Sequence, residues 1–146
     1  MIDGTIVELA QALKARRVSS TELTAEALTR IERAQSRFNA FITIDRDRAL
    51  ADARAADIAL RDGSAGPLTG IPLAHKDVLM TQGLRTTCGS RMLAHFVAPY
   101  DADVVARLRN AGTVLIGKTN MDEFAMGSSN ENSYFGAVHN PWNLAC

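Results

Sequence analysis

The sequence has 146 residues, of which 47% are hydrophobic and 22% charged, a composition and length suited to one packed domain. It holds 16 Lys and Arg residues against 16 Asp and Glu residues, so its formal net charge is zero. Phosphate contacts supply most of the affinity of nucleic-acid-binding proteins. The absence of a net positive charge therefore argues against a segment that itself binds RNA or DNA.

Cysteine usage and the apolar runs point to a cellular compartment. Cys88 and Cys146 fit no metal or disulfide spacing, which favours a reduced protein. Residues 1–4 have neither the basic nor the apolar region of a secretion signal, and no apolar run approaches the roughly 20 residues of a membrane helix. We therefore expect a soluble cytoplasmic protein.

Helical periodicity dominates the first part of the chain. Apolar residues recur at helical spacing over residues 6–13, and Ser19 with Glu22 forms a capping box that opens a second helix. A third helix is predicted over residues 45–62, where Gly63 would end it.

Short apolar segments predict strands. Residues 38–44 are aromatic and β-branched. Residues 71–74 are apolar and lead into three polar residues, 75–77, which a buried strand would deliver to a site. A helix over residues 101–111 is followed at once by an apolar strand over residues 113–116. A helix leading directly into a buried strand indicates an α/β fold.

The composition changes at Gly63 from helical periodicity to turn residues, which suggests two regions. Residues 1–62 are expected to be mainly helical, and residues 63–146 are expected to form the first part of an α/β core within one domain.

Lys76 stands between His75 and Asp77 and is flanked by apolar residues on both sides. A lysine carried into a desolvated pocket loses proton affinity and can act as a base. The alternative is a charged strand end that is solvated or ion-paired. Local sequence leaves both interpretations open.

A run of small residues, Met126–Gly127–Ser128–Ser129–Asn130, follows a predicted helical turn or two over residues 121–126. Its backbone N–H groups and hydroxyls would suit an oxyanion or a small polar substrate. The alternative is an ordinary flexible loop. Asp122 and Glu123 are interpreted as a charge pair at the start of that helix.

Residues 112–119 match the phosphate-loop pattern G-x-x-x-x-G-K-T. The four interior residues form a strand in their own right and a helix precedes the first glycine, so we interpret Gly112 as a helix stop before a core strand. His75, His95 and His139 have no carboxylate or thiol at ligand spacing, and we expect no metal site.

Taken together, these motifs resemble one family. Residues 70–77, 86–90 and 100–105 resemble the amidase-signature enzymes in order and spacing. Residues 117–131, 135–136 and 140–143 are similar, more narrowly, to the A subunits of tRNA-dependent amidotransferases. The resemblance implies the amidase-signature fold, in which N-terminal helices precede the first strands of a central mixed β-sheet flanked by helices, incomplete over this length of chain.

The same resemblance implies a reaction and its residues. Lys76 would be the base of a Ser–cis-Ser–Lys triad, and Met126, Gly127 and Ser128 would line the glutamine pocket. Glutamine would be hydrolysed to ammonia, which a partner subunit uses to convert Glu-tRNA(Gln) or Asp-tRNA(Asn). The implied partners are the B and C subunits of a heterotrimer, with tRNA contacted mainly by the partner; ATP and Mg would serve the partner subunit, and this chain would need no cofactor.

The family's serine signature is expected just beyond the segment at residues 140–143. We therefore expect residues 1–146 to be an N-terminal piece that is inactive alone. Two alternatives remain: a non-catalytic remnant that binds partner subunits, and a general amidase of the same family that acts on free amides.

Overall fold

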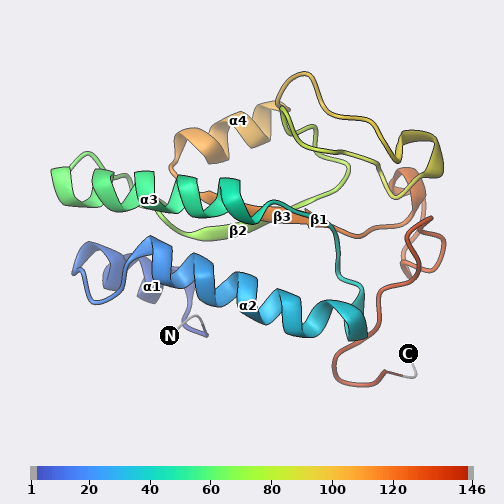
Figure 1. Ribbon diagram of the computed structural model, residues 1–146, viewed down its shortest axis with the longest axis horizontal. Coiled ribbons are helices and arrows are strands. Elements are labelled where there is room, and N and C mark those ends of the chain that lie inside the picture. The colour runs from blue at the N-terminus through green and yellow to red at the C-terminus, as the bar shows by residue number, and fades with distance from the viewer. Residues whose placement is uncertain (1–2, 145–146) are drawn as a thin grey trace. The chain divides into compact units, whose positions relative to one another are not determined.

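The computed structural model describes residues 3–144, so Cys146 lies outside the described residues. Helices and strands alternate as the α/β prediction requires (Figure 1). In chain order the elements are α1 (Ile6–Lys14), α2 (Ser20–Phe38), β1 (Phe41–Ile44), α3 (Arg46–Asp62), β2 (Pro72–Lys76), the 3-10 turn η1 (Arg91–Leu93), α4 (Asp103–Asn110), β3 (Val114–Thr119) and the 3-10 turn η2 (Glu123–Ala125).

Local sequence signals account for the helix ends. The predicted capping box of α2 is confirmed: the Ser19 backbone N–H donates to the Glu22 carboxylate at 2.8 Å, and the Glu22 N–H donates to Ser19 Oγ at 3.1 Å. At the end of α3, Gly63 takes the left-handed conformation (φ +79°), and its N–H donates to the carbonyl of Ala59. These caps satisfy backbone groups that a helix leaves unpaired.

The three strands form a sheet in the order β1-β3-β2. β1 runs antiparallel to β3, with Thr43 opposite Lys118 and Ile44 opposite Gly117. A bulge lies between Phe41 and Thr43. Gly117 is required by this pairing, because a Cβ there would lie 2.5 Å from the carbonyl oxygen of Thr43.

β2 and β3 run in the same direction. Val114 N–H donates to the carbonyl of Ile71 at 2.9 Å, and Asp77 N–H donates to the carbonyl of Thr119 at 3.1 Å. One antiparallel and one parallel neighbour make the sheet mixed, as the family resemblance implied.

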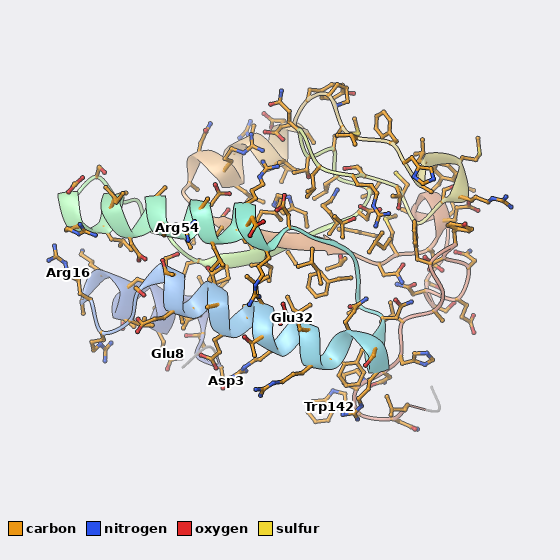
Figure 2. All side chains as sticks on the ribbon, in the orientation of Figure 1. Asp3, Glu8, Arg16, Glu32, Arg54 and Trp142 are labelled. Atoms are coloured by element: carbon orange, nitrogen blue, oxygen red, sulfur yellow. The ribbon has the colours of Figure 1, made fainter. Side chains whose placement is uncertain are left out.

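The chain divides into two compact units, each assembled from three stretches. The first contains residues 1–31, 45–73 and 107–116, and the second contains residues 32–44, 74–106 and 117–146. In the first unit, α1, α2 and the chain before β2 share an apolar cluster of Leu9, Leu13, Leu23 and Ile71. Asp3 lies beside α2 (Figure 2), where its carboxylate pairs with Arg30. Because both side chains are exposed, this pair contributes little to stability.

Two segments differ from expectation. β3 does not end at Ile116 but continues to Thr119, which brings Lys118 into the sheet. Of the helical turn or two expected over residues 121–126, one forms as the 3-10 turn η2, and Phe124 within it has a left-handed φ of 53°. Asp122 directly precedes this turn, and its carboxylate bonds to amides further along the chain.

No helix among residues 3–144 combines the length and the apolar character needed to span a membrane.

Candidate functional site

Lys76 ends β2 in the second unit, and its side chain is exposed. It lines an open pocket of about 350 Å³. Gly127 and Ser128 line the same pocket, and the other lining residues come from the chain between Thr119 and Asn130. Three of the four residues predicted for the site therefore meet around one cavity.

Met126, the fourth predicted residue, does not line this pocket among the described residues. Its side chain is 80% exposed. It lies between η2 and Gly127, where the backbone turns, so its neighbours on either side line the pocket while its own side chain extends into solvent.

Asp122 shapes the pocket loop. Its carboxylate is buried and accepts the backbone N–H of Asn130 at 2.9 Å and that of Asn132 at 3.4 Å. Gly127 lies so close that a Cβ there would be 2.5 Å from Asp122 Cγ. The loop is thus folded around one carboxylate, and only glycine fits at residue 127.

Asn120 anchors the start of this loop through both ends of its amide group. Its Oδ1 accepts from Met121 N–H and from Ser133 Oγ, and its Nδ2 donates to the carbonyls of Asn39 and Gly136. A buried amide with every group paired fixes its backbone firmly.

Backbone strain is concentrated in the same loop. Phe124, Ala125 and Asn130 have φ values of 53°, 59° and 60°, a region that residues other than glycine rarely adopt. Each such residue costs on the order of 1–3 kcal/mol, and such strain gathers at ligand sites more often than elsewhere. Ala125 and Asn130 both line the pocket.

A second lysine, Lys118, lies fully buried on β3. Its ammonium donates to the carbonyl of Leu79 at 2.9 Å and to Thr86 Oγ1 at 2.8 Å, and it pairs with Asp77 Oδ1 at 3.3 Å. Burial lowers the pKa of Lys118, and the negative charge of Asp77 opposes that shift. The desolvated lysine of the second unit is therefore Lys118, whereas Lys76 is exposed.

Residues 86–90 connect this buried pair to the pocket loop. The N–H and hydroxyl of Thr87 both donate to Asp77 Oδ2. The Cys88 carbonyl accepts from Phe124 N–H at 2.8 Å, and the Gly89 carbonyl accepts from Tyr134 N–H at 2.8 Å. This segment therefore bonds to the residue after Lys76 on one side and to the pocket loop on the other.

Cys88 lies between these two sets of contacts. It is partly buried, and burial raises the pKa of its thiol, with the nearby charge of Asp77 adding to the rise. A thiol of this kind is a poor nucleophile at neutral pH.

Sequence reasoning missed the pairing of Asp77 with Lys118 and the bonding role of Asp122. In the sequence, Lys118 follows the strand predicted over residues 113–116 and matches the lysine of a phosphate-loop pattern, and neither feature indicates a buried ion pair. Among residues 3–144 no group of His, Cys, Asp and Glu side chains is arranged to hold a metal ion.

Comparison with known proteins identifies a family and a similar relative. The family model described as amidase matches residues 22–146. The A subunit of glutamyl-tRNA(Gln) amidotransferase from Aromatoleum aromaticum is 64% identical over 142 residues, which is 97% of this chain and 29% of that protein. The chain therefore spans less than a third of the length of this relative.

Solved structures of a peptide amidase and of a hydrolase share the fold. The peptide amidase from Stenotrophomonas maltophilia is 35% identical with a TM-score of 0.89, covering 98% of this chain and 31% of the amidase. A 6-aminohexanoate cyclic dimer hydrolase is 28% identical with a TM-score of 0.88, covering 99% of this chain and 29% of the hydrolase.

Proposed function

The chain belongs to the amidase family, and from that premise we propose that it forms the N-terminal part of a glutamine-hydrolysing subunit of a tRNA-dependent amidotransferase. The ammonia released would convert Glu-tRNA(Gln) or Asp-tRNA(Asn) to the amidated form on a partner subunit. The observation that carries the site is the pocket shared by Lys76, Gly127 and Ser128.

The substrate class rests on the pattern of identities. The chain is 64% identical to a relative named for its part in an amidotransferase, against 35% and 28% for the peptide amidase and the cyclic dimer hydrolase. All three comparisons cover nearly the whole chain, so the difference in sequence identity reflects a closer relationship and not a longer alignment.

Lys76 is proposed as the base. In the acyl transfer that the resemblance implies, Lys76 draws a proton, through a bridging serine, from a nucleophilic serine further along the polypeptide. The serine oxygen bonds to the side-chain amide carbon of glutamine, the C–N bond breaks, and the nitrogen leaves with that proton as ammonia. Water then hydrolyses the acyl-enzyme.

Gly127 and Ser128 are proposed to bind the substrate. The exposed loop offers backbone N–H groups and a hydroxyl to a small polar ligand, and the pocket of about 350 Å³ is of a size that suits an amino acid. Met126, whose side chain is exposed, is proposed to contribute through its backbone.

The proposed partners are the B and C subunits of a heterotrimer. ATP and Mg would be used by the partner subunit, which would also make most of the tRNA contacts. The zero net charge of this chain fits a segment that does not grip tRNA itself.

The test uses the full-length protein that contains this chain, purified with the subunits that accompany it. Ammonia release from glutamine and amidation of Glu-tRNA(Gln) are measured for the wild type, for Lys76→Ala and for Lys14→Met, an exposed lysine on α1. Loss of both activities in Lys76→Ala alone supports the proposal. Full activity in Lys76→Ala refutes the assignment of the base.

A second candidate function is favoured by the structural likeness to the peptide amidase. A general amidase would release ammonia from simple amides without a partner subunit. Turnover of free amides by the full-length protein on its own, with no amidation of tRNA in any mixture, would select this candidate.

A further inference from the structure

Asp77, the residue after Lys76, is held by hydrogen bonds at its backbone and at Oδ2, and by an ion pair at Oδ1. Its N–H donates to the carbonyl of Thr119 at 3.1 Å, and its carbonyl accepts from Cys88 N–H at 3.3 Å. Its Oδ2 accepts both donors of Thr87, and its Oδ1 lies 3.3 Å from the Lys118 ammonium. The side chain is fully buried, so water competes with none of these contacts.

Lys118 is also linked to Lys76 through the backbone of Leu79. The backbone N–H of Leu79 donates to the carbonyl of Lys76 at 3.0 Å, which closes a turn directly after β2. The carbonyl of the same Leu79 accepts from the Lys118 ammonium at 2.9 Å. One buried ammonium thus holds both the residue after Lys76 and the turn that bonds to the Lys76 carbonyl.

The side chain of Lys76 itself is exposed, and a lysine carries its amine on a flexible four-carbon stem. A base of this kind reaches a reacting atom reproducibly only where its backbone is fixed, because small displacements of a catalytic group are costly. The ion pair of Asp77 and Lys118 supplies this fixed backbone.

We propose that Asp77 and Lys118 are positioning residues, which hold the backbone at Lys76 in register with its pocket and thereby set the rate of the amide-cleaving step. The inference rests on the proposed function, because Lys76 must act as the base. It adds a role for a buried ion pair that does not itself touch the substrate.

The positioning role predicts an effect on kcat, whereas a merely structural role predicts an effect on stability alone. Thr87→Val is the milder probe: it removes the hydroxyl bond to Asp77 and the bond that the same hydroxyl accepts from Gly89 N–H, but it keeps the backbone N–H bond to Asp77. Thr87→Ser restores the hydroxyl. Thr24→Val is the matched control, since Thr24 is also fully buried and its hydroxyl has no hydrogen-bond partner among the described residues.

Asp77→Asn provides the stronger perturbation. It keeps the shape of the side chain but removes the charge that faces Lys118. If Asp77→Asn fails to fold, Thr87→Val still decides the question.

The experiment measures kcat and KM for glutamine in the full-length protein, together with amide hydrogen exchange over residues 76–88. We expect Thr87→Val and Asp77→Asn to lower kcat by about tenfold or more with a nearly unchanged KM, since a displacement of 1 Å can cost about 100-fold. Exchange over residues 76–88 should rise in both. Thr87→Ser and Thr24→Val should match the wild type.

Unchanged kcat in Thr87→Val and in folded Asp77→Asn, or unchanged exchange over residues 76–88, overturns the inference and leaves the pair a purely structural one. Full turnover in Lys76→Ala overturns the proposed function instead. The two failures are therefore distinguishable in one set of variants.

Discussion

The carboxylate of Asp77 lies 3.3 Å from the ammonium of Lys118, and both side chains have no exposed surface. Two charges withdrawn from water in this way are costly unless each is paired. Here Thr87 donates two hydrogen bonds to Asp77, and the Thr86 hydroxyl accepts one from Lys118. The pair thus lies in a polar network within the second unit.

Removing one partner should be strongly destabilising. Lys118→Met leaves the Asp77 carboxylate buried without a counter-charge, and we expect the free energy of unfolding to fall by about 3–5 kcal/mol. The double variant with Asp77→Asn removes both charges. Its loss of unfolding free energy should be smaller than the sum of the losses in the two single variants. Urea denaturation of the four proteins measures this, and strictly additive losses would show that the two residues are not coupled.

The stability of the protein should depend on Lys118 at alkaline pH. Burial lowers the pKa of Lys118 below its ordinary value of 10.5. Between the lowered pKa and 10.5, the unfolded chain holds more protons at this residue than the folded chain, so the free energy of unfolding rises with pH. The difference in stability between the wild type and Lys118→Met should therefore grow across this window.

A Cys88→Ala background removes an opposing effect from that comparison. Burial raises the pKa of the Cys88 thiol, so between 9.0 and the raised pKa the folded protein holds the extra proton and stability falls as pH increases. Denaturant midpoints at closely spaced pH values, with and without Lys118→Met, provide the measurement. A constant difference across the window would contradict the prediction.

Elements defined by neighbouring residues could be predicted from sequence. The capping box of Ser19 and Glu22 and the end of α3 at Gly63 each involve bonds over a few residues, and both predictions are confirmed. The capping box of α1, formed by Thr5 and Glu8, follows the same rule and could have been identified in the same way.

Features that depend on distant residues could not be predicted. Lys118 is bound by groups 32 and 39 residues away, and nothing in its own strand identifies them. Asp122 precedes η2, as expected of a helix-start residue, but its carboxylate does not cap that turn and instead accepts N–H groups 8 and 10 residues later. The family resemblance indicated Lys76, Gly127 and Ser128, which line one pocket, but it did not indicate the hydrogen bonds that hold the pocket loop.

Gly127→Ala should disturb the pocket through the added Cβ alone, because Gly127 has no positive φ that alanine would avoid. The added Cβ would lie 2.5 Å from Asp122 Cγ, so the loop or the carboxylate must shift, at a cost of about 1–3 kcal/mol. We expect KM for glutamine to rise. Gly66→Ala is the control, because a Cβ there has its nearest neighbour at 3.8 Å. Equal KM values for the wild type and Gly127→Ala would show that the loop does not bind substrate.

Ser128 tests whether the pocket alone can perform the reaction. It lines the same cavity as Lys76, yet the described residues show no hydrogen bond between the two side chains. A serine is activated when its base lies within about 2.6–3.2 Å, and the resemblance assigns the nucleophile to a serine beyond residue 143. A polypeptide limited to residues 1–146 should therefore release no ammonia from glutamine.

In the full-length protein, Ser128→Ala should raise KM for glutamine but retain most of kcat, because Ser128 is expected to bind substrate and not to attack it. Lys76→Ala should instead abolish kcat. Ammonia release at saturating glutamine separates the two variants. Turnover by residues 1–146 that disappears with Ser128→Ala would identify Ser128 as the nucleophile and replace the mechanism proposed here.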